Sequence, residues 1–293
     1  APDAILQLGD RFVSQKLYDW IASKRPKVHC QVSNHPLRRD PIHSITHRIV
    51  SELPSFITSL TRALPGRPHS EWLKAWKELN HLVETGTAAY FKMHPALTEP
   101  ALFHHLKEAV PPSFGIYFGN SLSIRNADAF FAPKNPVGPL FGNRGLSGID
   151  GNIATIAGLA SGIGKGIVGV IGDLTFLHDL NSLPLIRDLP VKLVVINNNG
   201  GDIFSFLPIM SHSEVFKPFF LTPHNSDLKH AGKLFGIPYD QVETYEMLDD
   251  CLSQDRGGII EVKTRHGESL DIHRDLLSNL KVIQSHVTEL TTG

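Results

Sequence analysis

Residues 167–175, Ile-Val-Gly-Val-Ile-Gly-Asp-Leu-Thr, decide the fold, because an apolar run ends there in a glycine and an acidic residue. A short apolar run bounded in this way is typical of a buried strand, here at 167–171. A second run, Leu-Val-Val-Ile-Asn-Asn-Asn-Gly-Gly at 193–201, predicts a strand at 191–196 that ends in amides and glycines. The stretch between them, 175–187, is predicted to be a helix. Strand, helix and strand in this order predict a parallel βαβ unit.

Strands and helices alternate on both sides of this unit. The expected upstream elements are a helix at 99–110 capped by Thr98, a strand at 115–118, a helix after Ser121, a glycine-rich loop at 142–151 and a helix at 152–161. Further units continue to residue 262. The alternation predicts an α/β fold with a doubly wound parallel sheet. Ligands of such sheets bind beyond the carboxyl ends of the strands, so the residues after Phe118, Ile171 and Ile196 are candidates for a binding site.

The first part of the chain has the same pattern on a smaller scale. Its expected elements are strands at 4–9, 28–32 and 46–50 and helices at 14–23 and 52–63. A turn-rich stretch at 65–69 precedes a helix that carries Trp72, Trp76 and Leu79 on one face and is broken at 93–95. We therefore expect two domains, a partial central α/β domain at 1–90 and a larger domain at 91–293. Because a strand follows almost directly after Ala-Pro-Asp, we expect the chain to be a piece of a longer polypeptide.

The composition is ordinary for an α/β protein. Of the 293 residues, 41% are hydrophobic and 19% are charged, which excludes a disordered or fibrous chain. The 28 basic residues balance the 29 acidic ones, so no net charge would attract nucleic acid or an anionic membrane. Two distant cysteines indicate a reducing compartment, the cytoplasm or an organelle interior such as a plastid. No apolar run reaches the roughly 20 residues that a membrane span needs.

Polar side chains follow both strands of the central βαβ unit. Asp173 comes after the first strand, and Asn198 comes 25 residues later, after the second. A right-handed crossover places these two strand ends side by side, so a carboxylate and an amide oxygen converge. Mg²⁺ prefers such oxygen ligands together with phosphates and water, and Gly172 and Gly200 would let a diphosphate approach the backbone. The alternative is that Asp173 only caps a helix and that the Asn/Gly run is an ordinary turn.

Together, these strand-end residues resemble the diphosphate and metal motif of thiamine diphosphate enzymes. Leu174 stands where many members of that group have a glycine. A more specific set of motifs resembles the succinyl-enolpyruvyl-hydroxy-cyclohexene-carboxylate synthases of menaquinone and phylloquinone biosynthesis over nearly the whole chain. These motifs are Asn120-Ser121 to Arg125, Asn143-Arg144-Gly145 to Gly148-Ile149-Asp150-Gly151, Gly172-Asp173-Leu174 to His178-Asp179, and Asn198-Asn199-Gly200-Gly201 to Ile203-Phe204 and Leu207-Pro208.

The resemblance implies a role for each matching residue. Asp173, the Asn198 side chain and the Gly200 carbonyl would hold Mg²⁺ or Mn²⁺. Ser121, Arg125 and Arg144 would bind the carboxylates of 2-oxoglutarate and isochorismate, for which planar arginine donors are well suited. The remaining residues would contact the cofactor or form the apolar wall of the site, with Ile149 supporting the bent cofactor. These are Gly145, Ser147, Gly148, Ile149, Asp150, Gly172, Leu174, Gly201 and Ile203 for the cofactor, and Ile203, Phe204 and Leu207 for the wall.

The implied activity is decarboxylation of 2-oxoglutarate and 1,4-addition of the succinyl unit to isochorismate by a transferase. The family activates its cofactor with a glutamate of a pyrimidine-binding domain, which would lie before residue 1, so we assign none of this chain's glutamates as the catalytic acid. The expected assembly is a homodimer or homotetramer, and the isolated chain is expected to be inactive. The alternatives are another thiamine diphosphate decarboxylase or carboligase, or an inactive diphosphate-binding fragment.

Other patterns have simpler interpretations. The GxGxxG pattern is matched by Gly164-Lys165-Gly166-Ile167-Val168-Gly169. A dinucleotide-binding motif follows a strand, whereas this match leads into one. No acidic residue or cysteine completes a zinc set with His35, His43 and His47. His178 and Asp179 could relay protons or only favour a helix N-terminus. Lys16 could contact isochorismate, although its Gln-Lys pair departs from the family's Lys-Arg.

Overall fold

The computed structural model describes residues 2–66 and 70–292, and for 281–292 it describes the backbone alone. Contacts divide the chain into two compact units, Ala1–Trp76 and Lys77–Gly293. The division falls inside helix α3 (Glu71–Met93), which ends where the sequence predicted a break. The predicted domain boundary near residue 90 stays a prediction.

The first unit contains a parallel sheet in the order β1-β2-β3. Its strands are β1 (Ala4–Leu8), β2 (Val28–Ser33) and β3 (His47–Val50), close to the predicted ranges. Helix α1 (Gln15–Lys24) follows β1 and begins at Ser14, whose hydroxyl accepts a hydrogen bond from the Leu17 N–H. Helix α2 (Leu53–Ala63) follows β3. The predicted turn at 65–69 includes residues 67–69, which lie outside the described residues.

The second unit has a parallel sheet in the order β5-β4-β6-β7-β9-β8. The chain runs outward from β4 to β5 and then returns to form β6 on the other side, so the direction of winding reverses next to β4. The prediction of a doubly wound parallel sheet is confirmed. The strands are β4 (Gly115–Phe118), β5 (Leu140–Phe141), β6 (Ile167–Gly172), β7 (Val191–Asn197), β8 (Tyr239–Val242) and β9 (Gly258–Lys263).

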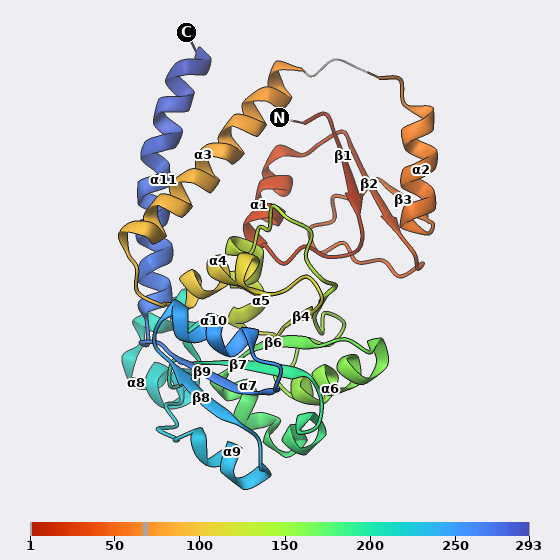
Figure 1. Cartoon of the computed structure of the whole chain (residues 1–293). Coiled ribbons are helices and arrows are strands. Elements are labelled where there is room, and N and C mark those ends of the chain that lie inside the picture. The colour runs from red at the N-terminus through yellow and green to blue at the C-terminus, as the bar shows by residue number, and fades with distance from the viewer. Residues whose placement is uncertain (1, 67–69, 293) are drawn as a thin grey trace. The chain divides into compact units, whose positions relative to one another are not determined.

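Helices cover both faces of this sheet (Figure 1). The helices are α4 (Glu99–Ala109), α5 (Leu122–Phe130), α6 (Asn152–Ile163), α7 (Asp173–His178), α8 (Ser213–Phe216), α9 (Lys229–Phe235), α10 (Tyr245–Ser253) and α11 (Glu268–Thr292). Short 3₁₀ segments lie at η1 (Leu180–Ile186), η2 (Asp202–Phe206) and η3 (Pro208–Ser211), and η4 (Lys217–Leu221) is a π-helical turn.

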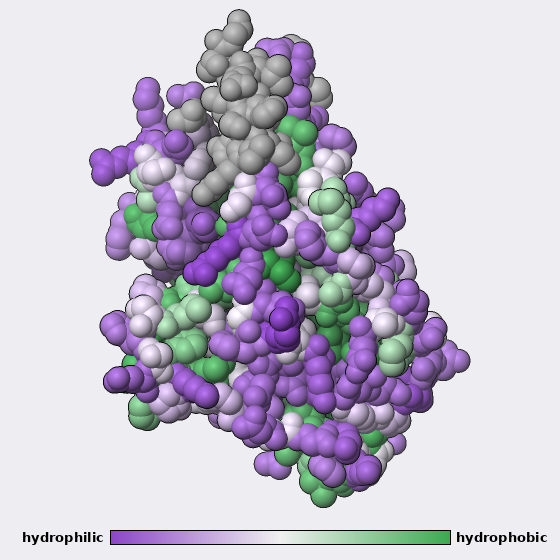
Figure 2. Space-filling view, turned by 90° about the vertical axis from the view of Figure 1, so that its left-hand side faces the viewer, coloured by the Kyte–Doolittle hydropathy of each residue, from purple (hydrophilic) through white to green (hydrophobic). Residues whose placement is uncertain are grey.

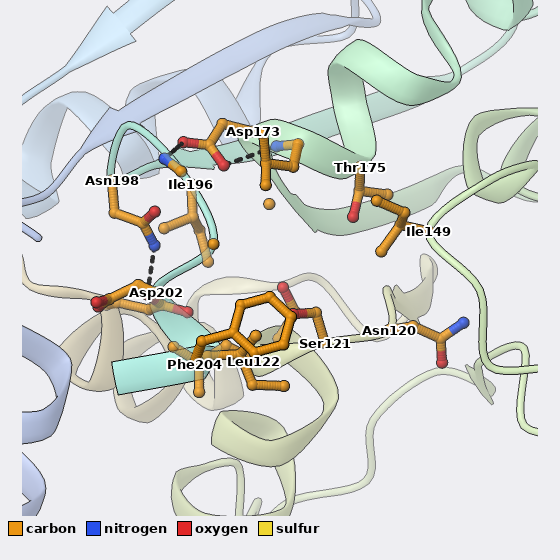
Figure 3. A pocket seen from close by; sticks show the side chains of 17 residues that line it. Asn120, Ser121, Leu122, Ile149, Asp173, Thr175, Ile196, Asn198, Asp202 and Phe204 are labelled. Carbon is orange, nitrogen blue, oxygen red and sulfur yellow. Dashed lines mark hydrogen bonds between the residues drawn. The ribbon is translucent and has the colours of Figure 1, made fainter. Parts of the chain in front are cut away.

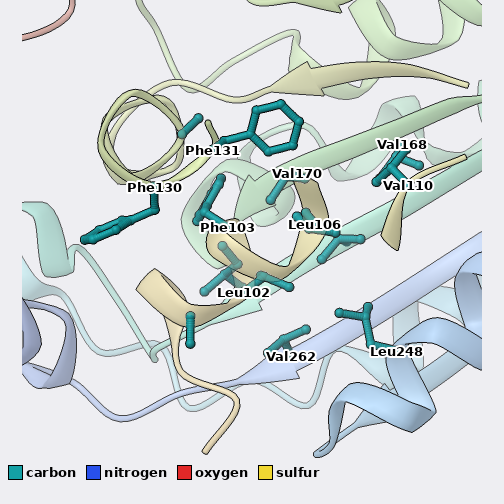
Figure 4. Close-up of a cluster of buried hydrophobic side chains, with 14 of the residues drawn as sticks. Leu102, Phe103, Leu106, Val110, Phe130, Phe131, Val168, Val170, Leu248 and Val262 are labelled. Atoms are coloured by element: carbon teal, nitrogen blue, oxygen red, sulfur yellow. The ribbon is translucent and has the colours of Figure 1, made fainter. Parts of the chain in front are cut away.

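Alternate residues of the central strands enter two separate hydrophobic cores. Val168 and Val170 of β6 pack with Leu102 and Phe103 of α4 in one core (Figure 4). Ile167 and Ile171 of the same strand belong to the other core, together with Ile153 and Ile156 of α6. A strand buried on both faces is apolar at nearly every position, which explains the run that begins at Ile167.

The crossover between β6 and β7 differs from the prediction of one helix at 175–187. The α-helix α7 already ends at His178, and η1 continues as a 3₁₀ segment that contains Pro184. Proline has no N–H to donate and its ring crowds the preceding turn, so a continuous α-helix through Pro184 would be strained. The crossover is therefore two short segments that meet at Asp179.

Asp179 caps helix α6, which precedes it in the sequence. Its Oδ2 accepts hydrogen bonds from the N–H groups of Ile153 (2.6 Å) and Ala154 (3.1 Å) at the start of α6. The N-cap residue of α6 is Gly151, which has no side chain to make these bonds. His178, in contrast, is exposed at the end of α7.

No helix of the described part of the chain is both long and apolar enough to cross a membrane. On the face shown in Figure 2, apolar side chains lie in small groups between hydrophilic ones.

We expect Asp179→Ala to lower the free energy of unfolding by about 1–2 kcal/mol, the usual range for the loss of a helix cap. Asp179→Asn keeps one acceptor oxygen and should lose less. Urea denaturation measures both changes. Asp188→Ala is the matched control, because that side chain is 85% exposed and caps no helix. Equal stability of the Asp179→Ala and Asp188→Ala variants would contradict the capping role.

Candidate active site

A pocket lies at the carboxyl ends of β4, β6 and β7, next to the point where the winding of the sheet reverses (Figure 3). The register of the sheet pairs Gly172 of β6 with Ile196 of β7, so the residues that follow these two strands lie side by side. The pocket brings together many of the predicted site residues, namely Ser121, Ile149, Gly172, Asp173, Leu174, Asn198, Gly200, Gly201, Ile203 and Phe204.

Asp173 is the acidic residue of the pocket that the sequence identified, and it is only 2% exposed. Its Oδ1 accepts from the Leu174 N–H (2.6 Å), and its Oδ2 accepts from the Gly200 N–H (2.9 Å) and lies 3.2 Å from Nε2 of His224. Burial raises the pKa of Asp173, while its hydrogen bonds to His224, Gly200 and Leu174 act in the opposite direction. Asp173 thus holds the loop after β7 against the end of β6.

Asn198 has a free acceptor in this pocket. The residue is 7% exposed, and its Nδ2 donates a long hydrogen bond of 3.4 Å to Oε2 of Glu99. Its Oδ1 is buried and has no hydrogen-bond partner among the described residues. A buried acceptor without a donor costs about 1–3 kcal/mol, so this oxygen fits a cation ligand.

The glycines beside these residues have different structural reasons. Gly200 has φ +148°, and a Cβ atom there would lie 2.2 Å from the Leu221 carbonyl oxygen. Gly201 likewise packs closely, with its N–H donating to the same oxygen (2.7 Å). A Cβ at Gly172, in contrast, would meet no atom within 4 Å, although Gly172 lines the pocket. Gly172 therefore leaves space where a phosphate could approach the backbone, whereas Gly200 and Gly201 allow the loop to pack.

Two buried carboxyl groups of the pocket were missed by the sequence analysis. Glu99 is 3% exposed, and burial, followed by the charge of nearby Asp202, raises its pKa to about 8. A cation in the pocket would act in the opposite direction, because positive charge favours the carboxylate. Oδ1 of Asp202 accepts from Ser205 (2.7 Å) and the Gly267 N–H (3.0 Å), and its Oδ2 has no hydrogen-bond partner among the described residues.

No local signal in the sequence marks these two carboxyl groups. Glu99 is an acidic residue in the first turn of a helix, followed by proline, which is a common solvent-exposed position. Only the packing of α4 against the sheet brings Glu99 to the end of β7. Asp202 looks like part of a polar loop, and its partner Gly267 is distant in sequence.

The predicted carboxylate-binding residues lie at and beside the pocket. Ser121 lines it and has φ +69°, an unusual conformation for a residue other than glycine. Arg125 donates to the Ser121 carbonyl oxygen (2.5 Å), and Arg144 donates to Oδ1 of Asn120 (2.8 Å). Burial and then the charge of Arg144 lower the pKa of Arg125, so the two guanidinium groups are electrostatic neighbours. Neither forms an ion pair with a carboxylate in the described part of the chain.

Other predicted residues do not line this pocket. Arg125 and Arg144 lie beside it, Leu207 is 49% exposed, and the loop residues Gly145, Ser147, Gly148 and Asp150 are exposed. The loop is nevertheless tied to the pocket, because Asn120 donates to the Gly148 carbonyl oxygen (2.7 Å). Lys16 is exposed on α1 of the first unit, so its predicted role stays a prediction.

The described residues contain no group of three or more His, Cys, Asp or Glu side chains that could hold a metal ion. Besides the carboxyl groups of Glu99 and Asp202, the pocket offers the Asp173 carboxylate, the Asn198 amide oxygen and backbone carbonyls. A metal bound there would need further ligands, such as the phosphates that Mg²⁺ commonly retains.

Comparison with known proteins relates both the fold and the sequence to thiamine diphosphate enzymes. Residues 1–118 match the family described as the middle domain of thiamine pyrophosphate enzymes. An X-ray structure from Mycobacterium smegmatis, described as a thiamin diphosphate-dependent enzyme, is similar in fold, with a TM-score of 0.59 and 17% sequence identity. The similarity covers 90% of this chain and 49% of that one. At this identity the structure supports the fold alone.

Curated relatives are more similar in sequence. All three named here are 2-succinyl-5-enolpyruvyl-6-hydroxy-3-cyclohexene-1-carboxylate synthases. The synthase of Rubrobacter xylanophilus is 36% identical over 281 residues, which are 94% of this chain and 49% of the relative. That of Salinibacter ruber is 36% identical over 285 residues (96% and 48%), and that of Chlorobium phaeobacteroides is 37% identical over 297 residues (98% and 50%).

The chain thus spans about half the length of the curated relatives that it matches, and the match extends over nearly all of its own length. Over nearly all of its length it is therefore similar to about half of a 2-succinyl-5-enolpyruvyl-6-hydroxy-3-cyclohexene-1-carboxylate synthase, and its residues 1–118 match a thiamine pyrophosphate middle domain.

Proposed function

We propose that this chain forms the diphosphate- and metal-binding part of an enzyme that decarboxylates 2-oxoglutarate and adds the succinyl unit to isochorismate. This reaction, a 1,4-addition, is a step of menaquinone or phylloquinone biosynthesis. The observation that carries the proposal is that Asp173 and Asn198 line one pocket at adjacent strand ends, where Oδ1 of Asn198 is buried and has no hydrogen-bond partner in the described part of the chain. The names of the curated relatives favour this reaction over that of another thiamine diphosphate carboligase.

The donor set of the pocket fits a hard cation held against a diphosphate. The Asp173 carboxylate, Oδ1 of Asn198 and the Gly200 carbonyl would bind Mg²⁺ or Mn²⁺. The backbone at Gly172, Leu174 and Gly201 would lie along the diphosphate. Thiamine diphosphate, when bound, supplies the covalent chemistry of decarboxylation and acyl transfer.

Apolar residues of the pocket would shape the space for the reacting groups. Ile149 would support the bent cofactor from the end of the loop that contains Gly145, Ser147, Gly148 and Asp150. Ile203 and Phe204 line the pocket, and Leu207 lies just beyond it in the sequence. These side chains would exclude water from the substrate, which strengthens polar contacts inside the site.

The substrate carboxylates would bind beside this wall. Arg125 and Arg144 are permanently charged, are near each other and have no carboxylate partner among the described residues. A guanidinium group can donate two parallel hydrogen bonds to one carboxylate. Such groups therefore suit substrates that carry several carboxylates. The strained backbone of Ser121 would present its hydroxyl to the same ligand.

The proposed active site is completed by a pyrimidine-binding domain that contributes the activating glutamate. In a homodimer or homotetramer this domain would come from another subunit, so this chain by itself is expected to be inactive. Both cysteines are free, which agrees with a reducing compartment such as the cytoplasm or a plastid.

The function is tested by an assay with Mg²⁺, thiamine diphosphate and 2-oxoglutarate, with and without isochorismate. The purified chain should show no turnover alone and should form the succinylated product when a separately expressed pyrimidine-binding domain is added. The reason is that positioned proton transfer is typically worth about 10²–10⁴-fold in rate. Turnover by the chain alone would refute the missing-domain proposal, and a product formed only without isochorismate would indicate another carboligase.

Asp173→Ala should abolish retention of the cofactor, because it removes the one carboxylate of the proposed metal shell. Isothermal titration calorimetry of the purified chain with thiamine diphosphate, in the presence of Mg²⁺, measures the cofactor dissociation constant. Asp188→Ala, which changes an exposed carboxylate outside the pocket, is the control. An unchanged cofactor dissociation constant in Asp173→Ala would exclude this metal assignment.

Arg125→Ala and Arg144→Ala should each lower kcat/KM by roughly 30-fold, which corresponds to about 2 kcal/mol for a lost hydrogen bond to a charged group. Steady-state kinetics of the complete enzyme with both substrates measure this effect. Cofactor affinity should change little, since neither side chain belongs to the metal shell. Arg187→Ala, at an exposed position, is the control. Normal kinetics for both substrates in both variants would show that these arginines do not bind the substrate carboxylates.

A further inference from the structure

Glu99 lies at the centre of a buried chain of hydrogen bonds that ends at Asn198. Its Oε1 accepts from Nδ2 of Asn126 (3.0 Å), and its Oε2 accepts from Nδ2 of Asn198 (3.4 Å). Oδ1 of Asn126 in turn lies 2.9 Å from Nε2 of His273 on α11. All of these contacts lie within the second unit, and Glu99 and Asn126 are both buried.

This chain fixes which way the Asn198 amide faces. Positive charge in the pocket favours the ionised form of Glu99, and a carboxylate can only accept hydrogen bonds, so beside a bound cation the NH₂ group of Asn198 must be the end that points to Glu99. The amide oxygen then points to the opposite side, where it is buried without a partner among the described residues and lines the pocket with Asp173. If the amide were reversed, its N–H groups would face the cation position and repel the ion.

The other end of the chain is held more firmly. Asn126 is bonded on both sides, by Glu99 and by His273, whose ring packs edge-on against Phe130 and Phe206. The Asn198 side chain, among the described residues, is bonded only by Glu99. Any mismatch introduced at Glu99 is therefore relieved most easily by rotation of Asn198.

We propose that Glu99 is a positioning residue that orients the Asn198 amide so that Oδ1 can bind the divalent cation. The proposal rests on the proposed metal site, where Glu99 would act through the metal ligand Asn198. Residues that orient metal ligands in this way typically contribute 10- to 100-fold to metal affinity.

Glu99→Gln changes the polarity of one contact with almost no change in shape. The glutamine oxygen can still accept from Asn126, but its NH₂ group then faces Asn198. Asn198 can respond by rotating so that Oδ1 accepts from the glutamine, which turns its N–H groups toward the cation. Affinity for Mn²⁺ in the presence of thiamine diphosphate should fall by about 10- to 100-fold.

The double variant Glu99→Gln with Asn198→Asp provides the decisive comparison. An aspartate has two acceptor oxygens, so one can accept from the glutamine while the other faces the cation. Most of the lost Mn²⁺ affinity should return. Asn198→Asp alone should bind Mn²⁺ less well than the double variant, because it places the new Asp carboxylate against the Glu99 carboxylate.

Electron paramagnetic resonance of free Mn²⁺ in titrations of the purified protein with thiamine diphosphate gives the affinities without any need for turnover. Thermal unfolding of each metal-free variant checks that the fold persists. The proposal is supported by weak binding in Glu99→Gln and recovery in the double variant. Wild-type affinity in Glu99→Gln, or a double variant as weak as the single one, would overturn it while leaving the metal site itself intact. Absence of Mn²⁺ binding in the wild-type protein would overturn the metal site and this inference together.

Discussion

The parallel register between β6 and β7 is the constraint on which the rest of the site depends. It pairs Gly172 with Ile196, so the two chains leave the sheet at one edge and place Asp173 beside the loop that contains Asn198. The Gly200 N–H then donates to Asp173 and closes the loop. A shift of one residue in this register would move every side chain of β6 to the opposite core, so packing on both faces enforces the geometry of the pocket.

The pocket combines this rigid frame with polar groups that the fold does not satisfy. Oδ1 of Asn198 and Oδ2 of Asp202 are buried acceptors without donors among the described residues. Such groups are costly in a folded protein unless a ligand compensates for them. Their position, next to a glycine that leaves open space at 172, is the arrangement expected where a cation and an anionic group bind together.

Asn120 connects this metal region to the proposed substrate region. It donates to the Gly148 carbonyl oxygen and accepts from Arg144, so one buried amide holds both the loop before α6 and a guanidinium group. The strained Ser121 follows directly, at the end of β4. The two regions are therefore built on neighbouring strand ends. Arg125 and Arg144 are held by a backbone carbonyl and an amide oxygen, which leaves their charges available to a ligand.

The sequence by itself determined the parallel sheet, because strands buried on both faces are nearly continuous apolar runs. It also determined that Asp173 and Asn198 follow adjacent strands, where ligands of such sheets bind. It did not determine that the crossover is divided at Asp179 into α7 and a 3₁₀ segment, nor that Asp179 caps α6. Only the tertiary structure decided the roles of Glu99 and Asp202. Their partners come from elements far away in the sequence, and an acidic residue in a helix or loop has the same local pattern whether it is solvated or buried.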